Sequence, residues 1–209
     1  MLMTKLMLSF VVLASMMAGT TMRPAQDATG TDGEGFIRTW LILAPIPSES
    51  EDSGSFELDK AQIKSEAMIK PKDGDKATVG GKELVWKKHT APGYYVDFKG
   101  FVGQGQSEDV VGYAVAYVVA DAEMKDLKLQ MGSNDQAKVY LNGKQLIKFD
   151  ETRTLEKDQN SADNVVLNKG TNVLILKVAN QKNDWQGAIR FTDKAGAAVK
   201  NVKVTLTPQ

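Results

Sequence analysis

The chain has no cysteine and only one histidine, His89. Without cysteine the fold has no disulfide, and a lipoprotein anchor, which is carried on a cysteine, is excluded. A Cys-His catalytic pair and a histidine-rich zinc site are excluded as well. We interpret His89, close to a Pro-Gly turn, as a solvated loop residue. The sequence also lacks the Gly-x-Ser-x-Gly pattern of a nucleophile elbow, so it does not indicate a Ser-His-Asp triad.

Neither sign of charge is in excess, because 26 lysines and arginines balance 26 aspartates and glutamates. Nucleic acids and anionic membranes attract basic patches, so this balance favours neither as a partner. Carboxylates are numerous, but no two of them are marked as a pair that faces across a glycosidase cleft. We therefore predict a protein that is not an enzyme. The alternative is an accessory domain of a glycan-degrading system.

A hydrophobic run that could span a bilayer is also missing. Lys5 precedes an apolar run over residues 6–18, which is shorter than the roughly 20 residues of a membrane helix. A short positive segment, an apolar segment and small residues after it are typical of a secretory signal peptide. We predict a signal peptide over 1–20, cleaved somewhere between 18 and 28, a flexible leader over 21–35 and a single domain over 36–209. The mature protein would be secreted or periplasmic and would not bind a membrane.

The remainder of the chain has the pattern of strands and turns that is typical of an all-β protein. β-branched and aromatic runs alternate with Gly, Pro and Asn turns. Strands are predicted over 36–43, 82–88, 94–101, 110–120, 127–131, 138–141, 144–149, 165–167, 172–179, 187–192 and 199–206. Asn142-Gly143 predicts a hairpin with a type I′ turn, because both residues tolerate positive φ. No segment repeats at a fixed period, which excludes a propeller or solenoid.

One short helix is expected among these strands. Asp59 and Gln62 have the spacing of a capping box, which predicts a helix over about 60–68. Many short strands with one helix favour a β-sandwich or barrel. The acidic stretches Glu49-Ser-Glu-Asp52 and Asp73-Gly-Asp75 could ligate a structural Ca²⁺. Neither has EF-hand spacing, and a solvated loop is the simpler interpretation of both.

The C-terminal half also resembles a known family. The runs that carry the resemblance are LQMGSNDQAKVYLNGK (129–144), VVLNKGTNVLILK (165–177) and AIRF (188–191), with WLILAPI (40–46) near the start. They are similar to galactose-binding-domain-like jelly rolls, which occur as non-catalytic modules of secreted bacterial glycoside hydrolases and polysaccharide lyases. The resemblance implies a jelly-roll β-sandwich and a carbohydrate-binding role, although a fold does not determine a function.

The sequence departs from the family pattern at two places. Asn134-Asp135-Gln136 stands where the family often has Asp-Asp-Gly, and Tyr140 replaces the usual Trp. Any ligand or ion contact that the family makes with the first Asp is therefore in doubt. The two turns that match, 142–143 and 170–172, are explained by backbone geometry alone.

Candidate ligand-binding residues are aromatic and polar side chains in predicted loops, because sugar rings stack on aromatics while their hydroxyls bind polar groups. Trp185 is the first candidate, with Asn183 and Asp184 beside it in a polar loop. Tyr94, directly after a Pro-Gly turn, is the second. The alternative for Trp185 is that it folds back and closes the end of the sandwich.

Asp135 and Arg153 are further polar candidates. Trp40 and Trp86 lie inside strand patterns, and we expect both in the core. The sequence therefore predicts a secreted, non-catalytic binding module whose partner is a glycan or polysaccharide. The alternative is a protein-interaction or structural module of the cell envelope, whose partner is an envelope or secreted protein.

Overall fold

The computed structural model describes residues 31–51, 53–103 and 106–208. The predicted signal peptide, its cleavage site and most of the predicted leader lie outside these residues. Across the described ranges, no helix has both the length and the apolar character to cross a membrane.

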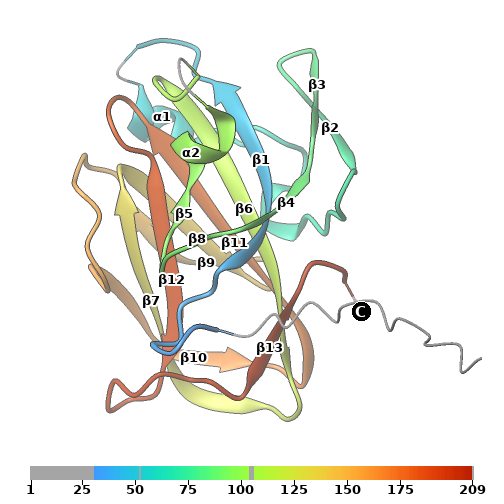
Figure 1. The fold of residues 1–209 in the computed structure, drawn as a ribbon, viewed down its shortest axis with the longest axis vertical. Coiled ribbons are helices and arrows are strands. Elements are labelled where there is room, and N and C mark those ends of the chain that lie inside the picture. The colour runs from blue at the N-terminus through green and yellow to red at the C-terminus, as the bar shows by residue number, and fades with distance from the viewer. Residues whose placement is uncertain (1–30, 52, 104–105, 209) are drawn as a thin grey trace, which may run out of the picture.

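Two antiparallel sheets face each other (Figure 1). The larger sheet has the order β4-β1-β6-β11-β8-β9, and β13 also pairs with β6. Its strands are β1 (Thr39–Pro47), β4 (Lys87–Thr90), β6 (Val110–Ala120), β8 (Gln136–Leu141), β9 (Lys144–Phe149), β11 (Gly170–Asn180) and β13 (Val202–Thr205). The smaller sheet has the order β10-β7-β12-β5, with β5 (Val96–Asp97), β7 (Met124–Asn134), β10 (Asn160–Leu167) and β12 (Gln186–Thr192). The prediction of an all-β sandwich is confirmed.

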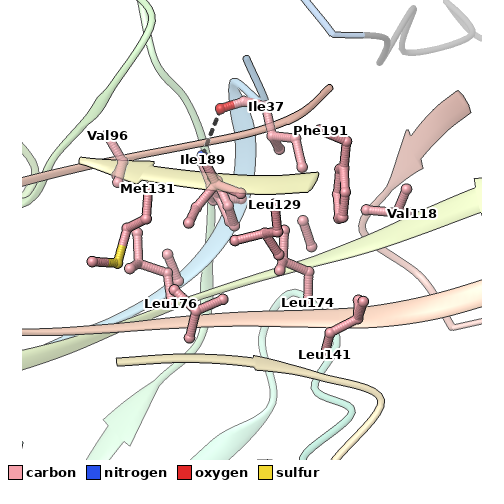
Figure 2. Packing of buried hydrophobic residues seen from close by; sticks show 14 of the residues in the cluster. Ile37, Val96, Val118, Leu129, Met131, Leu141, Leu174, Leu176, Ile189 and Phe191 are labelled. Atoms are coloured by element: carbon pink, nitrogen blue, oxygen red, sulfur yellow. Dashed lines mark hydrogen bonds between the residues drawn. The ribbon is translucent and has the colours of Figure 1, made fainter. Parts of the chain in front are cut away.

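Both faces of the large sheet are covered, and the sequence of β6 shows why. Its residues alternate, so that Ala114 and Val118 point toward the small sheet while Tyr113 and Tyr117 point away from it. The inner core, between the two sheets, is built from apolar side chains of both, such as those drawn in Figure 2. Trp40 belongs to this core, while Trp86 belongs to a second cluster on the opposite face. Both tryptophans are buried, as predicted.

The opposite face of the large sheet is covered by residues 53–86, which we call the outer segment. It contains α1 (Gly54–Asp59), the 3₁₀ helix η1 (Glu66–Met68) and the hairpin of β2 (Lys76–Val79) and β3 (Lys82–Val85). The prediction of a helix over 60–68 was wrong, because α1 ends at Asp59, where that helix was expected to begin. The Asp59 carboxylate does not cap a helix but accepts hydrogen bonds from Lys138 and Lys148, each at 2.8 Å.

The Asn142-Gly143 hairpin is confirmed. Asn142 and Gly143 both have positive φ, 51° and 84°, between β8 and β9. The Asn142 side chain also joins the hairpin to the start of β11, because its Oδ1 accepts from the Val173 amide and its Nδ2 donates to Asn172 Oδ1. The two segments that matched the family pattern are therefore joined to each other by hydrogen bonds.

Three local predictions differ from the structure. The strand predicted over 94–101 consists of the short β5 followed by α2 (Phe98–Val102), because the Asp97 side chain caps the helix by accepting from the Gly100 amide. Within the predicted leader, Asp32 Oδ1 accepts from the Phe36 amide, and Thr31 bridges to Ile37. The described part of the leader is thus folded onto the domain.

His89, interpreted as a solvated loop residue, lies in β4 opposite Trp40. Its ring contacts Phe101 edge-on at 5.6 Å, and burial lowers its pKa. His89 is in a strand and not in a loop because residues Lys87–Thr90 pair with β1 and form an edge strand of the large sheet.

Candidate ligand-binding site

Four of the six predicted site residues meet at one end of the sandwich. Three segments come together there: residues 133–136 between β7 and β8, the loop 150–159 before β10, and the turn 181–185 between β11 and β12. We call this arrangement the end cluster. It brings Asp135, Arg153, Asn183 and Asp184 to one region, with Trp185 beneath them.

Asp135 holds the three segments together. Its Oδ1 accepts from the Arg153 amide and its Oδ2 from the Gln181 amide, both at 3.3 Å. Burial raises its pKa, while these two hydrogen bonds oppose the rise. Because the residue is only 7% exposed and both carboxylate oxygens accept backbone amides, Asp135 positions neighbouring loops. Its predicted contact with a ligand stays a prediction.

Arg153 is partly buried and lies flat against an aromatic ring. Its guanidinium carbon is 3.6 Å from the centre of the Phe149 ring. The Nε and one terminal nitrogen donate to Ser133, at 3.2 and 2.8 Å to its Oγ. Burial lowers the pKa of Arg153 to about 10, which leaves the guanidinium charged at neutral pH. A stacked and hydrogen-bonded arginine of this kind is fixed in orientation before any ligand arrives.

Asn183 and Asp184 are exposed on the turn 181–185. The Lys99 ammonium donates to the Asn183 carbonyl at 2.9 Å and lies 3.7 Å from the Asp184 carboxylate. The Asn134 amide, with its nitrogen toward the acceptors, donates to the Asp184 carbonyl at 2.6 Å and to Asp135 Oδ1 at 3.3 Å. The backbone of the turn is therefore held, while the Asn183 and Asp184 side chains face solvent.

Trp185 is not a surface residue. It is 0% exposed, stacks on Phe98 at 4.9 Å, and donates from its indole nitrogen to the Val178 carbonyl. It therefore cannot stack on a sugar, and its predicted ligand role is wrong; the alternative, that it closes the end of the sandwich, is correct. One signal in the sequence pointed this way: Gly112 interrupts the bulky run of β6, and a Cβ there would collide with Trp185.

Tyr94 is not part of the end cluster. It packs against Phe36 at 5.2 Å and Tyr95 at 5.1 Å between ring centres, and the Lys157 ammonium lies 4.7 Å from its ring. Lys157 belongs to the loop 150–159, so Tyr94 contacts the loop that carries Arg153, but at a different residue. The sequence suggested one site for both residues, whereas the structure separates them.

Sequence reasoning missed two residues that organise this loop. Ser133 accepts from Arg153, and its amide donates to Gln159, whose own amide nitrogen donates to the Thr154 carbonyl. Gly132 allows the loop to lie against β7, because a Cβ there would collide with the Glu156 carbonyl. Apart from the local bond between Gln159 and Thr154, these contacts join residues at least 20 positions apart, and no local sequence pattern predicts them.

The acidic stretches considered for Ca²⁺ are engaged in other contacts. Asp73 and Asp75 accept from the amides of Lys88 and Lys72, each at 2.8 Å, and Glu49 pairs with Lys60; Asp52 lies outside the described residues. Within the described ranges, no three His, Cys, Asp or Glu side chains are grouped so that they could hold a metal ion.

Two cavities lie beside the β2–β3 hairpin, far along the chain from the end cluster. One, of about 410 Å³, is lined by residues such as Ile46, Pro47 and Leu84. The other, of about 460 Å³, lies at Ile69, Lys76 and Trp86. Neither is lined by a predicted site residue.

No family model and no curated protein matches the chain. Among solved structures, the chain is similar to the PA14 domain of the antifreeze protein MpAFP, with 11% sequence identity and a TM-score of 0.41. The match covers 88% of this chain and 98% of that domain. A likeness at this level says nothing about the ligand.

Proposed function

We propose that this protein is a non-catalytic binding module that takes carbohydrate at the end cluster. The observation that carries the proposal is the meeting, at one end of a rigid sandwich, of exposed Asn183 and Asp184 with the fixed guanidinium of Arg153. Amide, carboxylate and guanidinium groups bind pairs of sugar hydroxyls. Holding them in place before binding reduces the entropy lost when a ligand is ordered.

The hydrogen bonds within the cluster support this role. Asp135 and Asn134 hold the backbone of two loops, so the exposed side chains are carried by a supported frame. The resemblance to galactose-binding-domain-like modules points in the same direction.

The test is affinity electrophoresis through gels that contain soluble polysaccharides, together with a glycan array. The doubly substituted chain Asn183→Ala, Asp184→Ala is compared with the unaltered chain. We expect the unaltered chain to be retarded by at least one polysaccharide and the double variant to lose at least tenfold in affinity, because two exposed contacts are removed without loss of packing.

Asp121→Ala is the matched control. Its side chain is 83% exposed, and it follows β6 at the opposite end of the sandwich, so the retardation should be unchanged. Equal retardation of the double variant and the unaltered chain would place the binding surface elsewhere. No retardation by any glycan, from a sample with the circular dichroism of a folded β protein, would contradict the proposal.

Running the same gels with Ca²⁺ and then with a chelator tests the proposed structural ion. Retardation or thermal stability that falls in chelator supports it, and no change rejects it. Secretion or periplasmic export is likewise part of the proposal. N-terminal sequencing of the exported chain should place the new terminus between residues 18 and 28 of the full chain.

A protein-interaction role is the second candidate, and two exposed apolar residues favour it. Phe56 and Met68, both on the outer segment, have 61% and 62% of their surface exposed. Large exposed apolar side chains are common in protein interfaces. Size-exclusion chromatography with light scattering should then give an assembly larger than the monomer, reduced by Phe56→Ser. A monomer at all concentrations, together with glycan binding, would reject this candidate in favour of the first.

A further inference from the structure

We infer that Arg153 binds an anionic group, the carboxylate or sulfate of an acidic sugar. The inference rests on the proposed function and names the class of carbohydrate that the end cluster takes. The evidence for it is that the arginines of the described residues have different kinds of hydrogen-bond partner.

Arg190 has its charge neutralised inside the protein. Its Nε donates to Asp158 Oδ1 at 2.9 Å, a terminal nitrogen donates to Oδ2 of the same carboxylate, and the other terminal nitrogen donates to the Glu34 carbonyl. This fork-to-fork pairing is the strongest that an arginine makes. The charge of Arg190 is therefore already paired with a carboxylate of the protein itself.

Arg153 has no such partner. Its guanidinium donates only to the hydroxyl and carbonyl of Ser133, which are neutral groups. No carboxylate lies within ion-pair distance of it in the described ranges, and Asp135 accepts from its backbone amide, not from its side chain. A partly buried charge is normally paired, because removal from water is costly. The protein thus keeps a desolvated cation without a counter-ion of its own.

The positions of Phe149 and Ser133 leave one edge of the Arg153 guanidinium available to a ligand. Phe149 lies against one face of the guanidinium plane, and Ser133 takes the edge formed by Nε and one terminal nitrogen. The other terminal nitrogen, Nη1, has no hydrogen bond to a described residue. The planar edge that contains it can donate two parallel hydrogen bonds to a carboxylate or sulfate.

Arg38 is the third arginine of the described residues. It also lacks a carboxylate partner, but its Nε and terminal nitrogen donate to the carbonyls of Ala91 and Pro92, at 2.7 to 3.0 Å. It therefore fastens the loop after β4. Arg153 differs because it lies among exposed polar side chains at the end cluster.

The experiment measures binding of the full chain to polygalacturonate, to fully methyl-esterified polygalacturonate, to dextran sulfate and to neutral dextran. Methyl esterification removes the negative charge and keeps the sugar backbone. We expect binding to polygalacturonate or dextran sulfate to exceed binding to its uncharged counterpart at least tenfold, and to weaken as salt rises. Which of the two binds distinguishes a carboxylate from a sulfate.

Arg153→Gln should lower the affinity for the anionic polymer at least tenfold, and Lys203→Gln, which removes a positive charge at the opposite end, should leave it unchanged. Arg153→Lys keeps the charge but not the planar fork, so a loss of at least fivefold is expected. If Arg153→Gln does not fold, Arg153→Lys and the esterification series still decide the question.

The outcomes separate the inference from the proposed function. Equal binding of charged and uncharged polymers overturns the inference and leaves carbohydrate binding in place. A chain that binds no polymer, but whose Arg153 Nε–H signal shifts on titration with glucuronate or inorganic sulfate, supports the anion site and rejects the polysaccharide ligand. Absence of binding in every arm overturns both.

Discussion

The two faces of the large sheet are covered in different ways. The inner face packs against the small sheet through apolar side chains. The outer face packs against the outer segment, whose helices and strands are short. There, Glu66 and Lys177 are buried beside Tyr113 and Tyr140.

Hydrogen bonds satisfy this polar cluster completely. Glu66 accepts from the hydroxyls of Tyr113 and Tyr140, both at 2.6 Å, and from the Lys177 ammonium at 3.2 Å. Lys177 also donates to the carbonyls of Leu58 and Lys60. In this cluster, the Glu66 carboxylate and the carbonyls of Leu58 and Lys60 each have a partner on the sheet.

The difference shows how a segment that carries both apolar residues, such as Ile63 and Trp86, and a buried ion pair is held on a sheet. Apolar packing is non-directional, and it suffices where two patterned sheets meet. The outer segment adds directional hydrogen bonds to its apolar contacts. These bonds specify its position but require each buried charge to keep its partner. The following changes test this contrast, from the largest expected effect to the smallest.

Trp185→Ala tests the inner face. Removal of a fully buried indole that stacks on Phe98 should lower the free energy of unfolding by about 4 kcal/mol. Urea unfolding at pH 7 and pH 9 should give the same loss at both values, because no charge is involved. A loss below about 1 kcal/mol would show that the site collapses without a cavity.

Glu66→Gln tests the outer face. Glutamine has the shape of glutamate, but its single side-chain oxygen can accept from only one of the two tyrosines, and it leaves the buried Lys177 charge unpaired. The expected loss is about 3 kcal/mol in urea unfolding. In the double variant Glu66→Gln, Lys177→Met, the loss should be smaller than the sum of the single losses, because the unpaired charge is gone. Strict additivity would contradict the pairing.

The pH dependence of stability should also originate on the outer face. Burial lowers the pKa of Lys177 from 10.5 to about 8. Between these values the unfolded chain holds a proton that the folded chain has released, so stability from this residue rises with pH. The rise should be on the order of 2 kcal/mol between pH 8 and pH 9.5.

The matched comparison is Lys177→Met, in which this rise should be absent. Urea unfolding of both chains at pH 8, 8.5, 9 and 9.5 measures it. Burial and the neighbouring Glu66 raise the pKa values of Tyr113 and Tyr140. The unfolded tyrosines therefore lose protons first above about pH 10, which opposes the rise there. Identical pH profiles of the two chains below that pH would reject the assignment to Lys177.

Gly143→Ala is the smallest change, where the hairpin contacts the outer segment. Gly143 has φ of 84°, and a Cβ there would collide with the Met68 sulfur. The strained backbone alone should cost about 1 kcal/mol. Adding Met68→Ala should restore the part of the loss that comes from the collision and leave the backbone part. Thermal unfolding of the single and double variants separates the two; a full recovery would mean that strain contributes nothing.

Strand positions were the most predictable part of this fold. The run 110–120 and the Asn-Gly hairpin agree with the structure, because alternation and turn chemistry are local properties. The helix predicted at 60–68 failed because Asp59 and the carbonyls of the outer segment bind lysines far along the chain. A capping-box pattern does not reveal that its carboxylate has a stronger distant partner.

The candidate site was predictable only in part. Polar residues at 135, 153, 183 and 184 were selected from loops, and loops that follow neighbouring strands meet at one end of a sandwich. The sequence did not separate Tyr94 from them. It also left open whether Trp185 faces solvent, since an indole in a polar loop can either face solvent or fold back onto the end of the sandwich.

By itself, the sequence determined the fold class, the hairpin and the absence of cysteine chemistry, because these follow from residue type and short-range spacing. Only the tertiary structure decided which charges are paired. Arg190 meets Asp158 across 32 residues, Lys177 meets Glu66 across 111, and Arg153 meets no carboxylate in the described ranges. Pairing of a charge depends on distance in space after folding, and chain spacing does not encode that distance.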